Sequence, residues 1–236
     1  MQQILKISTA DFLLIFRDAS LKVFLFLPLL IFAVVIRGLP ALIHACPIVG
    51  EYQNYIILVA TIQLTQMFGF IYGMMLVDEK ETGVAKVYGV LPVHKISFIL
   101  GRFIFPILLT ILITWILLLV QPFYPIAIFP SLMFAFLAGL LVPVYAIAVS
   151  LLSATRIEAL VWVKVMNLLV ILPIMAFFVP KGFSYLFGIF PTYWLYLGLD
   201  QLIFEQSYWI SWVVGFVLLL LFIGILCLRF SKKHYE

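Results

Sequence analysis

Charged residues are scarce in this sequence. Only 10% of its 236 residues are Asp, Glu, Lys or Arg, and 66% are hydrophobic. A soluble domain typically carries about 25% charged and about 45–50% apolar residues, and a core of this size has no room for the excess apolar side chains. The composition therefore excludes a soluble globular protein and predicts an integral membrane protein whose surplus apolar residues face lipid.

The sequence also lacks the common catalytic motifs. It has no G-x-x-x-x-G-K-[ST] phosphate loop, no H-E-x-x-H, no G-x-S-x-G and no pair of Cys or His at metal-ligand spacing. Its two cysteines, Cys46 and Cys227, are expected near opposite membrane faces and so cannot pair. The 14 Lys and Arg residues form no cluster interleaved with aromatics, as nucleic-acid binding requires. We expect neither an enzyme nor a bound metal, cofactor or nucleic acid.

What the chain does contain is a series of long apolar runs. A helix needs about 20 mostly apolar residues to cross the hydrocarbon layer. Runs of sufficient length occupy residues 23–43, 55–77, 96–120, 126–152, 159–179 and 208–228. The sequence thus predicts an all-α integral membrane protein with six transmembrane helices in a single domain, 1–236. Four prolines inside these runs, Pro28, Pro106, Pro143 and Pro173, predict kinks rather than ends.

The basic residues are distributed unequally between the two sides of this topology. With the N-terminus inside, only Arg37 and Lys181 fall outside. The inside segments then hold the other twelve: Lys6, Arg17, Lys22, Lys80, Lys86, Lys95, Arg102, Arg156, Lys164, Arg229, Lys232 and Lys233. Because Lys and Arg are retained on the cytoplasmic side, we expect a multi-pass protein of the cytoplasmic (inner) membrane with both termini in the cytoplasm.

Two further segments are apolar but do not read as spans. Residues 1–20 place Leu5 and Phe12 opposite Lys6 and Asp11, which predicts an interfacial amphipathic helix; a frayed tail is the alternative. Residues 181–206 are aromatic but are interrupted by glycines and a proline and carry acidic side chains. We expect this segment to form a re-entrant or interfacial helical hairpin on the outside, sheltered by protein, before the last span.

Few polar side chains lie deep in the predicted spans. They are neutral amides: Gln63 and Gln66 in the second span and Asn167 in the fifth. Arg37, Arg102 and Lys164 lie near helix ends, where we expect them to extend toward the interface. Since secondary transporters and pumps generally use ionisable groups in the membrane, the sequence disfavours that class.

Small residues accompany the amides on one face of the second span. Gly69 and Gly73 follow Gln63 and Gln66 at helical spacing, and small residues let helices approach closely while amides hydrogen-bond between them. We interpret these four residues and Asn167 as a substrate path or a dimer seam. The alternative is an ordinary helix contact within one subunit.

The long loop at residues 78–97 is the main cytoplasmic surface between spans. It begins with acidic residues and contains a proline, which predicts a short helix at 84–91 presented to a cytoplasmic partner. The alternative is a solvated hairpin that only connects two spans.

The residues of this loop resemble those of the membrane subunit of ABC-2 type (type V) ABC exporters. The family's loop typically reads E-x-G-T-L-E-x-L-L-x-[ST]-P-[VL] and later G-K. Glu81, Gly83, Pro92, Val93 and Gly101 match, and Arg102 replaces the lysine. Departures from the pattern are Val84, Ala85, Lys86, Tyr88, Gly89 and Leu91. The interfacial entry helix, the six spans and the sequence Phe190-Pro191-Thr192-Tyr193 before the last span extend the resemblance along the chain.

The resemblance implies a transport subunit that is driven by other chains. It implies two membrane subunits, identical or related, with cytoplasmic ABC ATP-binding subunits that hold ATP and Mg²⁺, while this chain binds no cofactor and contacts membrane lipids. It also implies that the loop helix enters a groove of the ATPase. The residues assigned to this coupling are Asp78, Glu79, Glu81, Gly83, Lys86, Tyr88, Pro92, Gly101 and Arg102.

We therefore predict the permease subunit of an ATP-driven exporter that moves a small amphiphilic or lipid-like substrate by alternating access. Among such subunits, the small permeases for drugs and antimicrobial peptides are the most similar, because no large outside domain is present. Two alternatives stay open. One is a membrane immunity or binding protein that sequesters a ligand without transport, and the other is a secondary transporter.

Overall fold

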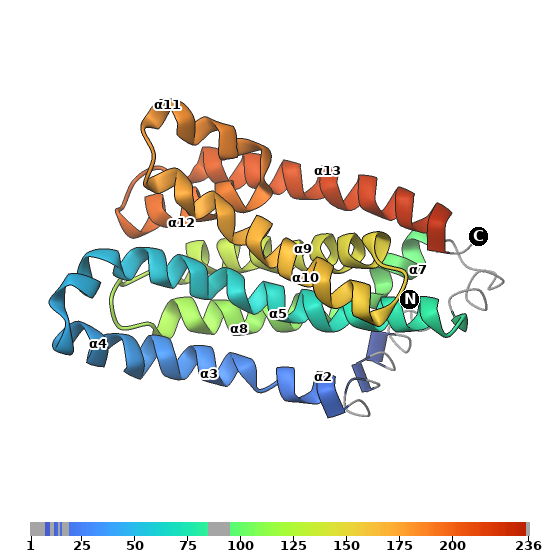
Figure 1. The fold of residues 1–236 in the computed structure, drawn as a ribbon. Coiled ribbons are helices and arrows are strands. Elements are labelled where there is room, and N and C mark those ends of the chain that lie inside the picture. The colour runs from blue at the N-terminus through green and yellow to red at the C-terminus, as the bar shows by residue number, and fades with distance from the viewer. Residues whose placement is uncertain (1–7, 10–11, 14, 16–18, 85–94, 235–236) are drawn as a thin grey trace.

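The computed structural model describes residues 8–9, 12–13, 15, 19–84 and 95–234. Within these residues the regular structure is entirely helical, which confirms the prediction of an all-α protein. The helices lie side by side in an elongated bundle, and both chain termini lie at one of its ends (Figure 1). This end is called the terminal end below. The predicted interfacial helix at 1–20 and the predicted loop helix at 84–91 lie largely outside the described residues.

Five helical stretches are long and apolar enough to cross a membrane. They are Leu21–Ala45, Pro47–Glu81, Ile128–Leu152, Arg156–Phe177 and Trp209–Lys232. The remaining predicted span, 96–120, is divided in two: α7 (Lys95–Arg102) ends before Phe103, and α8 (Ile104–Val120) is a shorter apolar helix. Pro106 is the third residue of α8, so its missing N–H removes no bond from the interior of a helix.

The first stretch is segmented and mostly exposed. It consists of α2 (Ala19–Phe24), α3 (Leu27–Ala33), a π-helix η1 (Val34–Gly38) and α4 (Leu39–Ala45). Pro28 and Pro40 lie in the first turns of α3 and α4, where a proline needs no intrahelical donor. The exposed side chains of this stretch are largely apolar, including Val23, Leu29 and Leu42, as a lipid-facing helix requires.

Two long helices form the centre of the bundle. The 3₁₀ turn η2 (Pro47–Tyr52) leads into α5 (Gln53–Glu81), and α5 packs along α9 (Ile128–Leu152). Most residues of both helices are buried. α8 packs against both α9 and α5, and α10 (Arg156–Ile171) packs against α5. Helix α9 continues through Pro143, whereas α10 ends before Pro173 and continues as the 3₁₀ turn η3 (Leu172–Phe177).

The segment predicted as a hairpin, 181–206, is helical and lies at the end of the bundle opposite the terminal end (Figure 1). It contains α11 (Lys181–Ser184), a 3₁₀ turn η4 (Tyr185–Ile189) and α12 (Pro191–Ile203). Helix α12 buries Tyr193, Tyr196 and Leu199 and packs on α13, α9, α5 and η3. Trp194 Nε1 donates to the carbonyl oxygen of Gly188 at 2.8 Å, which ties α12 to η4.

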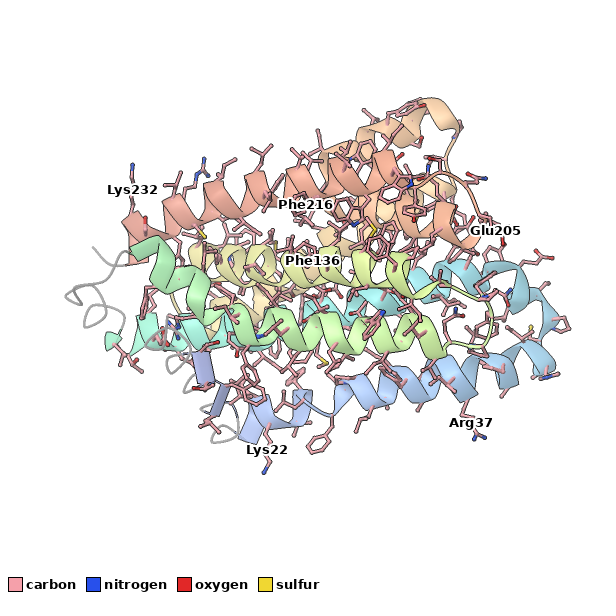
Figure 2. All side chains as sticks on the ribbon, turned by 180° about the vertical axis from the view of Figure 1, so that it is seen from behind. Lys22, Arg37, Phe136, Glu205, Phe216 and Lys232 are labelled. Carbon is pink, nitrogen blue, oxygen red and sulfur yellow. The ribbon has the colours of Figure 1, made fainter. Side chains whose placement is uncertain are left out.

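The last helix, α13 (Trp209–His234), packs along α9 and returns the chain to the terminal end. Figure 2 shows Phe136 of α9 and Phe216 of α13 between the two helices, and their ring centroids are 6.2 Å apart. The figure also shows Lys22 and Lys232 pointing away from the bundle near the terminal end, and Arg37 pointing away near the other end.

Candidate functional site

A cavity of about 320 Å³ opens between α5, α10 and the start of the first stretch. Its apolar lining residues are Phe24, Leu27, Met67, Phe70, Leu160 and Val163, and its polar ones are Gln63, Gln66, Lys164 and Asn167. We call it the amide cavity. A mostly apolar wall with a few polar groups is the usual composition of small-molecule sites.

The structure brings together the three amides singled out from the sequence. Gln66 is 2% exposed, and its Nε2 donates to the backbone oxygen of Asn167 at 3.1 Å. Its carbonyl oxygen Oε1 has no hydrogen-bond partner among the described residues. An unsatisfied buried acceptor costs about 1–3 kcal/mol, and Gln66 carries this cost beside the cavity because its Oε1 is covered by neighbouring atoms.

Tyr145 of α9 orients Asn167. Its hydroxyl lies 2.5 Å from Asn167 Oδ1 and 3.2 Å from the backbone oxygen of Val163. A phenol carries one hydrogen, and the shorter distance assigns it to Asn167. The sequence analysis missed Tyr145, although it is the one tyrosine within the run 126–152.

Two other features of the cavity were not predicted as a site. Phe24 and Phe70 place their ring centroids 4.5 Å apart at an interplanar angle of 51°, so an aromatic pair forms part of the wall. Lys164 lines the cavity with an exposed side chain, which supplies a positive charge beside the amides.

Gly69 and Gly73 lie elsewhere and face α9 of the same chain. A Cβ built on Gly69 would be 2.7 Å from Tyr145 Cδ1, and one on Gly73 would be 3.4 Å from Ala146 Cα. These glycines therefore permit close contact between α5 and α9 within one subunit, as the alternative had it. Their assignment to a substrate path or dimer seam stays a prediction.

A second site lies at the terminal end, in the last turn of α5. Four consecutive charged residues, Asp78 to Glu81, each bind a different group of the chain, and we call them the α5-end cluster. The sequence placed Asp78, Glu79 and Glu81 in a loop at 78–97. That boundary is corrected, because α5 extends to Glu81 and α7 begins at Lys95.

Glu79 and Arg102 form a buried bidentate ion pair. Arg102 Nη1 donates to Glu79 Oε2 at 2.7 Å, and Nη2 donates to Oε1. Arg102 is 2% exposed and Glu79 is 8% exposed. The expectation that Arg102 extends to the interface is wrong, because its guanidinium is enclosed between α5 and α7. Ser8 adds to this contact, since its hydroxyl donates to the backbone oxygen of Arg102 at 3.3 Å.

The other members of the cluster hold the ends of α9 and α10. Lys80 Nζ donates to the backbone oxygens of Ser150 and Ser153, at 3.3 and 2.6 Å, and so caps the carboxyl end of α9. Glu81 Oε2 accepts from the backbone N–H of Arg156 at 2.9 Å, at the amino end of α10. The Arg156 side chain in turn pairs with Asp78, with Nε and Oδ1 2.6 Å apart.

The start of α10 is also capped from within. Thr155 Oγ1 accepts from the backbone N–H of Glu158 at 3.3 Å, and Glu158 Oε2 accepts from that of Ala154 at 2.8 Å. The arrangement is similar to a capping box, except that Glu158 accepts from the residue before the N-cap Thr155 rather than from the N-cap itself. It fixes the position at which Glu81 and Asp78 contact α10.

Gly83 follows the α5-end cluster, two residues after Glu81. Its φ of +76° lies in the left-handed region that favours glycine, and its N–H donates to the backbone oxygen of Lys80 at 3.2 Å. Gly101 is buried in α7. The other residues assigned to coupling, Lys86, Tyr88 and Pro92, lie outside the described residues.

One titratable group at the opposite end has a perturbed pKa. Burial raises the pKa of Asp200 in α12, and a hydrogen bond from Asn54 Nδ2 to Asp200 Oδ1 at 3.0 Å partly opposes that rise. The bond also connects α12 to the start of α5. Within the described residues, no three His, Cys, Asp or Glu side chains cluster as metal ligands.

Five helical stretches long and apolar enough to cross a membrane, three of which line the amide cavity, are typical of a multi-pass α-helical membrane protein. No curated protein matches the chain. A family model described as "Fluoroquinolones export permease protein Rv2686c-like" matches residues 11–227, and the chain belongs to this family, which is an ABC-2 type permease family. The resemblance stated from the loop residues is thereby confirmed.

Proposed function

We propose that this chain is the membrane subunit of an ATP-driven exporter of amphiphilic small molecules. Membership of an export permease family supports this, and the amide cavity is the observation that connects it to the structure. In the proposed complex, two such subunits, identical or related, meet cytoplasmic ATP-binding subunits that hold ATP and Mg²⁺. The protein lies in the inner membrane, with both termini inside, α8 as a sixth span and 181–206 re-entering from outside.

The α5-end cluster supplies a path for coupling. The predicted coupling segment follows the cluster in sequence and precedes α7, and the cluster bonds join α5 to α7, α9 and α10. A displacement that an ATPase imposes on the end of α5 therefore acts on four helices together. Alternating access follows if the ATPase contact differs between the inward- and outward-facing states, since a partner shifts an equilibrium only by that difference.

The amide cavity fits an aromatic amphiphile. Phe24, Phe70 and Met67 offer a surface for a flat apolar body, the partly buried Gln63 offers an amide, and Lys164 attracts a carboxylate. Fluoroquinolones, which the family description names, combine a flat aromatic system with a carboxylate and an amine. They are the first substrates to test.

The test measures ATP hydrolysis by the full chain purified with a co-expressed ATP-binding partner, with and without a fluoroquinolone. We expect the partner to copurify and the drug to stimulate hydrolysis. Asn167→Leu removes a polar wall group of the cavity, and one lost hydrogen bond is worth about 0.5–1.5 kcal/mol. The drug concentration for half-maximal stimulation should rise roughly three- to tenfold.

Leu168→Ala is the matched control, because Leu168 is the next residue of α10 and its side chain is exposed and does not line the cavity. It should respond to drug as the native protein does. Drug binding to a chain that recruits no ATP-binding protein would instead support a sequestering protein. Equal drug responses in Asn167→Leu and Leu168→Ala would remove the amide cavity from the substrate path.

A further inference from the structure

A second, larger cavity of about 490 Å³ lies between α9 and α13. It is lined by Ala148, Leu151 and Leu152 near the end of α9, and by Leu226, Arg229 and Lys232 near the end of α13. Both helix ends lie at the terminal end of the bundle (Figure 1). The cavity is separate from the amide cavity and shares no lining residue with it.

The lining divides by chemistry. Four of its residues are aliphatic, and the other two are basic and exposed. Arg229 and Lys232 are three residues apart, so they lie on one face of α13. In the part of the chain that the structure describes, neither forms an ion pair and no carboxylate lines the cavity. Figure 2 shows the Lys232 side chain directed away from the bundle.

We infer that this cavity binds an anionic phospholipid of the cytoplasmic leaflet. Arg229 and Lys232 contact the headgroup phosphate, and Leu151, Leu152 and Leu226 pack against the upper acyl chain. The inference rests on the proposed orientation, which places the terminal end in the leaflet where anionic lipids meet basic residues beside helix ends. A free phosphate would use only the basic pair, whereas a lipid also covers the aliphatic wall.

Native mass spectrometry of the full chain, released from detergent, tests the inference without an ATPase or a drug, so its outcome is independent of the proposed function. The protein is titrated separately with phosphatidylglycerol, phosphatidylcholine and inorganic phosphate. We expect retained phosphatidylglycerol adducts and much weaker retention of phosphatidylcholine. In Arg229→Gln/Lys232→Gln, phosphatidylglycerol affinity should fall about tenfold or more.

Two other variants serve as comparisons. One removes a basic residue that lies outside the cavity, and the other fills the cavity without changing its charge. Lys22→Gln removes an exposed basic residue that also lies near the terminal end but does not line the cavity, and it should keep native affinity. Ala148→Phe fills the cavity and keeps both charges, and it should weaken binding. If this variant does not fold, the charge variants still decide the result.

Three results would overturn the inference. The first is equal retention of the two lipids by the native chain. The second is unchanged phosphatidylglycerol affinity in the double variant. The third is displacement of the lipid by inorganic phosphate at comparable concentration, which would reassign the basic pair to a soluble anion.

Discussion

At the scale of single residues, the Glu79–Arg102 pair is the most consequential contact. Both groups are almost fully buried, and the pair joins α5 to α7 across 23 residues of sequence. Burying two charges carries a large desolvation penalty, so such a pair adds little net stability. Removing one partner is strongly destabilising, because it leaves the other charge buried without its counterion.

We predict a strongly non-additive double-mutant cycle at this pair. Glu79→Leu and Arg102→Met should each lower the free energy of unfolding by about 3–5 kcal/mol, whereas Glu79→Leu/Arg102→Met should lose far less. Chemical unfolding of the purified chain, followed by tryptophan fluorescence, measures the three values. Additive losses would mean that the two side chains do not depend on each other.

Glu79 and Arg102 were both predicted as coupling residues, but not as partners of each other. A cluster of charges between two apolar runs reads as solvated, and neither periodicity nor propensity indicates that residues 79 and 102 meet. The break at Phe103 lies where Pro106 has no N–H for the backbone oxygen of Arg102, which accepts from the Ser8 hydroxyl instead. The amides were easier to find, since polar side chains inside apolar runs stand out.

At the scale of helices, the α5–α9 contact organises the bundle. Gly69 lies against the ring of Tyr145, and the hydroxyl of the same ring reaches Asn167 in the amide cavity. Helix packing and cavity geometry therefore depend on one side chain. A group added at Gly69 would push on a ring that is 1% exposed and has little space in which to move.

Gly69→Leu should therefore destabilise the subunit itself. Overpacking costs about 1–3 kcal/mol, and displacing Tyr145 from Asn167 costs about 1 kcal/mol more. Gly224→Leu is the control, because a Cβ at Gly224 has no atom within 4 Å, and its stability should be nearly native. The measurement is the thermal midpoint in detergent. Equal midpoints for the two variants would show that α5 and α9 are not in close contact at Gly69.

The helices themselves were largely predictable, because apolar runs bounded by charge predict spans by length alone. Each of the six runs corresponds to helix in the structure, although 96–120 contains a break and 159–179 ends in a 3₁₀ turn. Whether a proline lies inside a helix or begins a new one could not be predicted from the sequence. Pro143 remains inside α9, whereas Pro28, Pro106 and Pro173 lie in the first turns of new segments, and only the packing around each proline decides between these outcomes.

At the scale of the whole molecule, the basic residues are distributed unequally between the two ends of the bundle. Lys22 and Lys232 lie near the terminal end, and Arg37 lies near the other end (Figure 2). If Lys and Arg are retained in the cytoplasm, the terminal end is the cytoplasmic end. This places the α5-end cluster where an ATP-binding protein can reach it and α12 on the outside.

Thiol labelling of intact cells tests this orientation. Cys46 is exposed at the end of α4, whereas Cys227 is 2% exposed within α13. The native Cys227 is therefore shielded by packing on either orientation and reports nothing about sidedness. A useful inside probe is an exposed position at the terminal end, and Lys22→Cys in a Cys46→Ser background provides one.

An impermeant maleimide added to intact cells should label the native chain at Cys46 and leave Lys22→Cys/Cys46→Ser unlabelled until the membrane is permeabilised. The native Cys227 acts as an internal control, because it should stay unlabelled in both states while the chain is folded. The reverse pattern, with Lys22→Cys labelled in intact cells and Cys46 protected, would invert the topology. It would also place the α5-end cluster outside, where no ATP-hydrolysing partner could act on it, so one labelling experiment tests both the orientation and the proposed coupling.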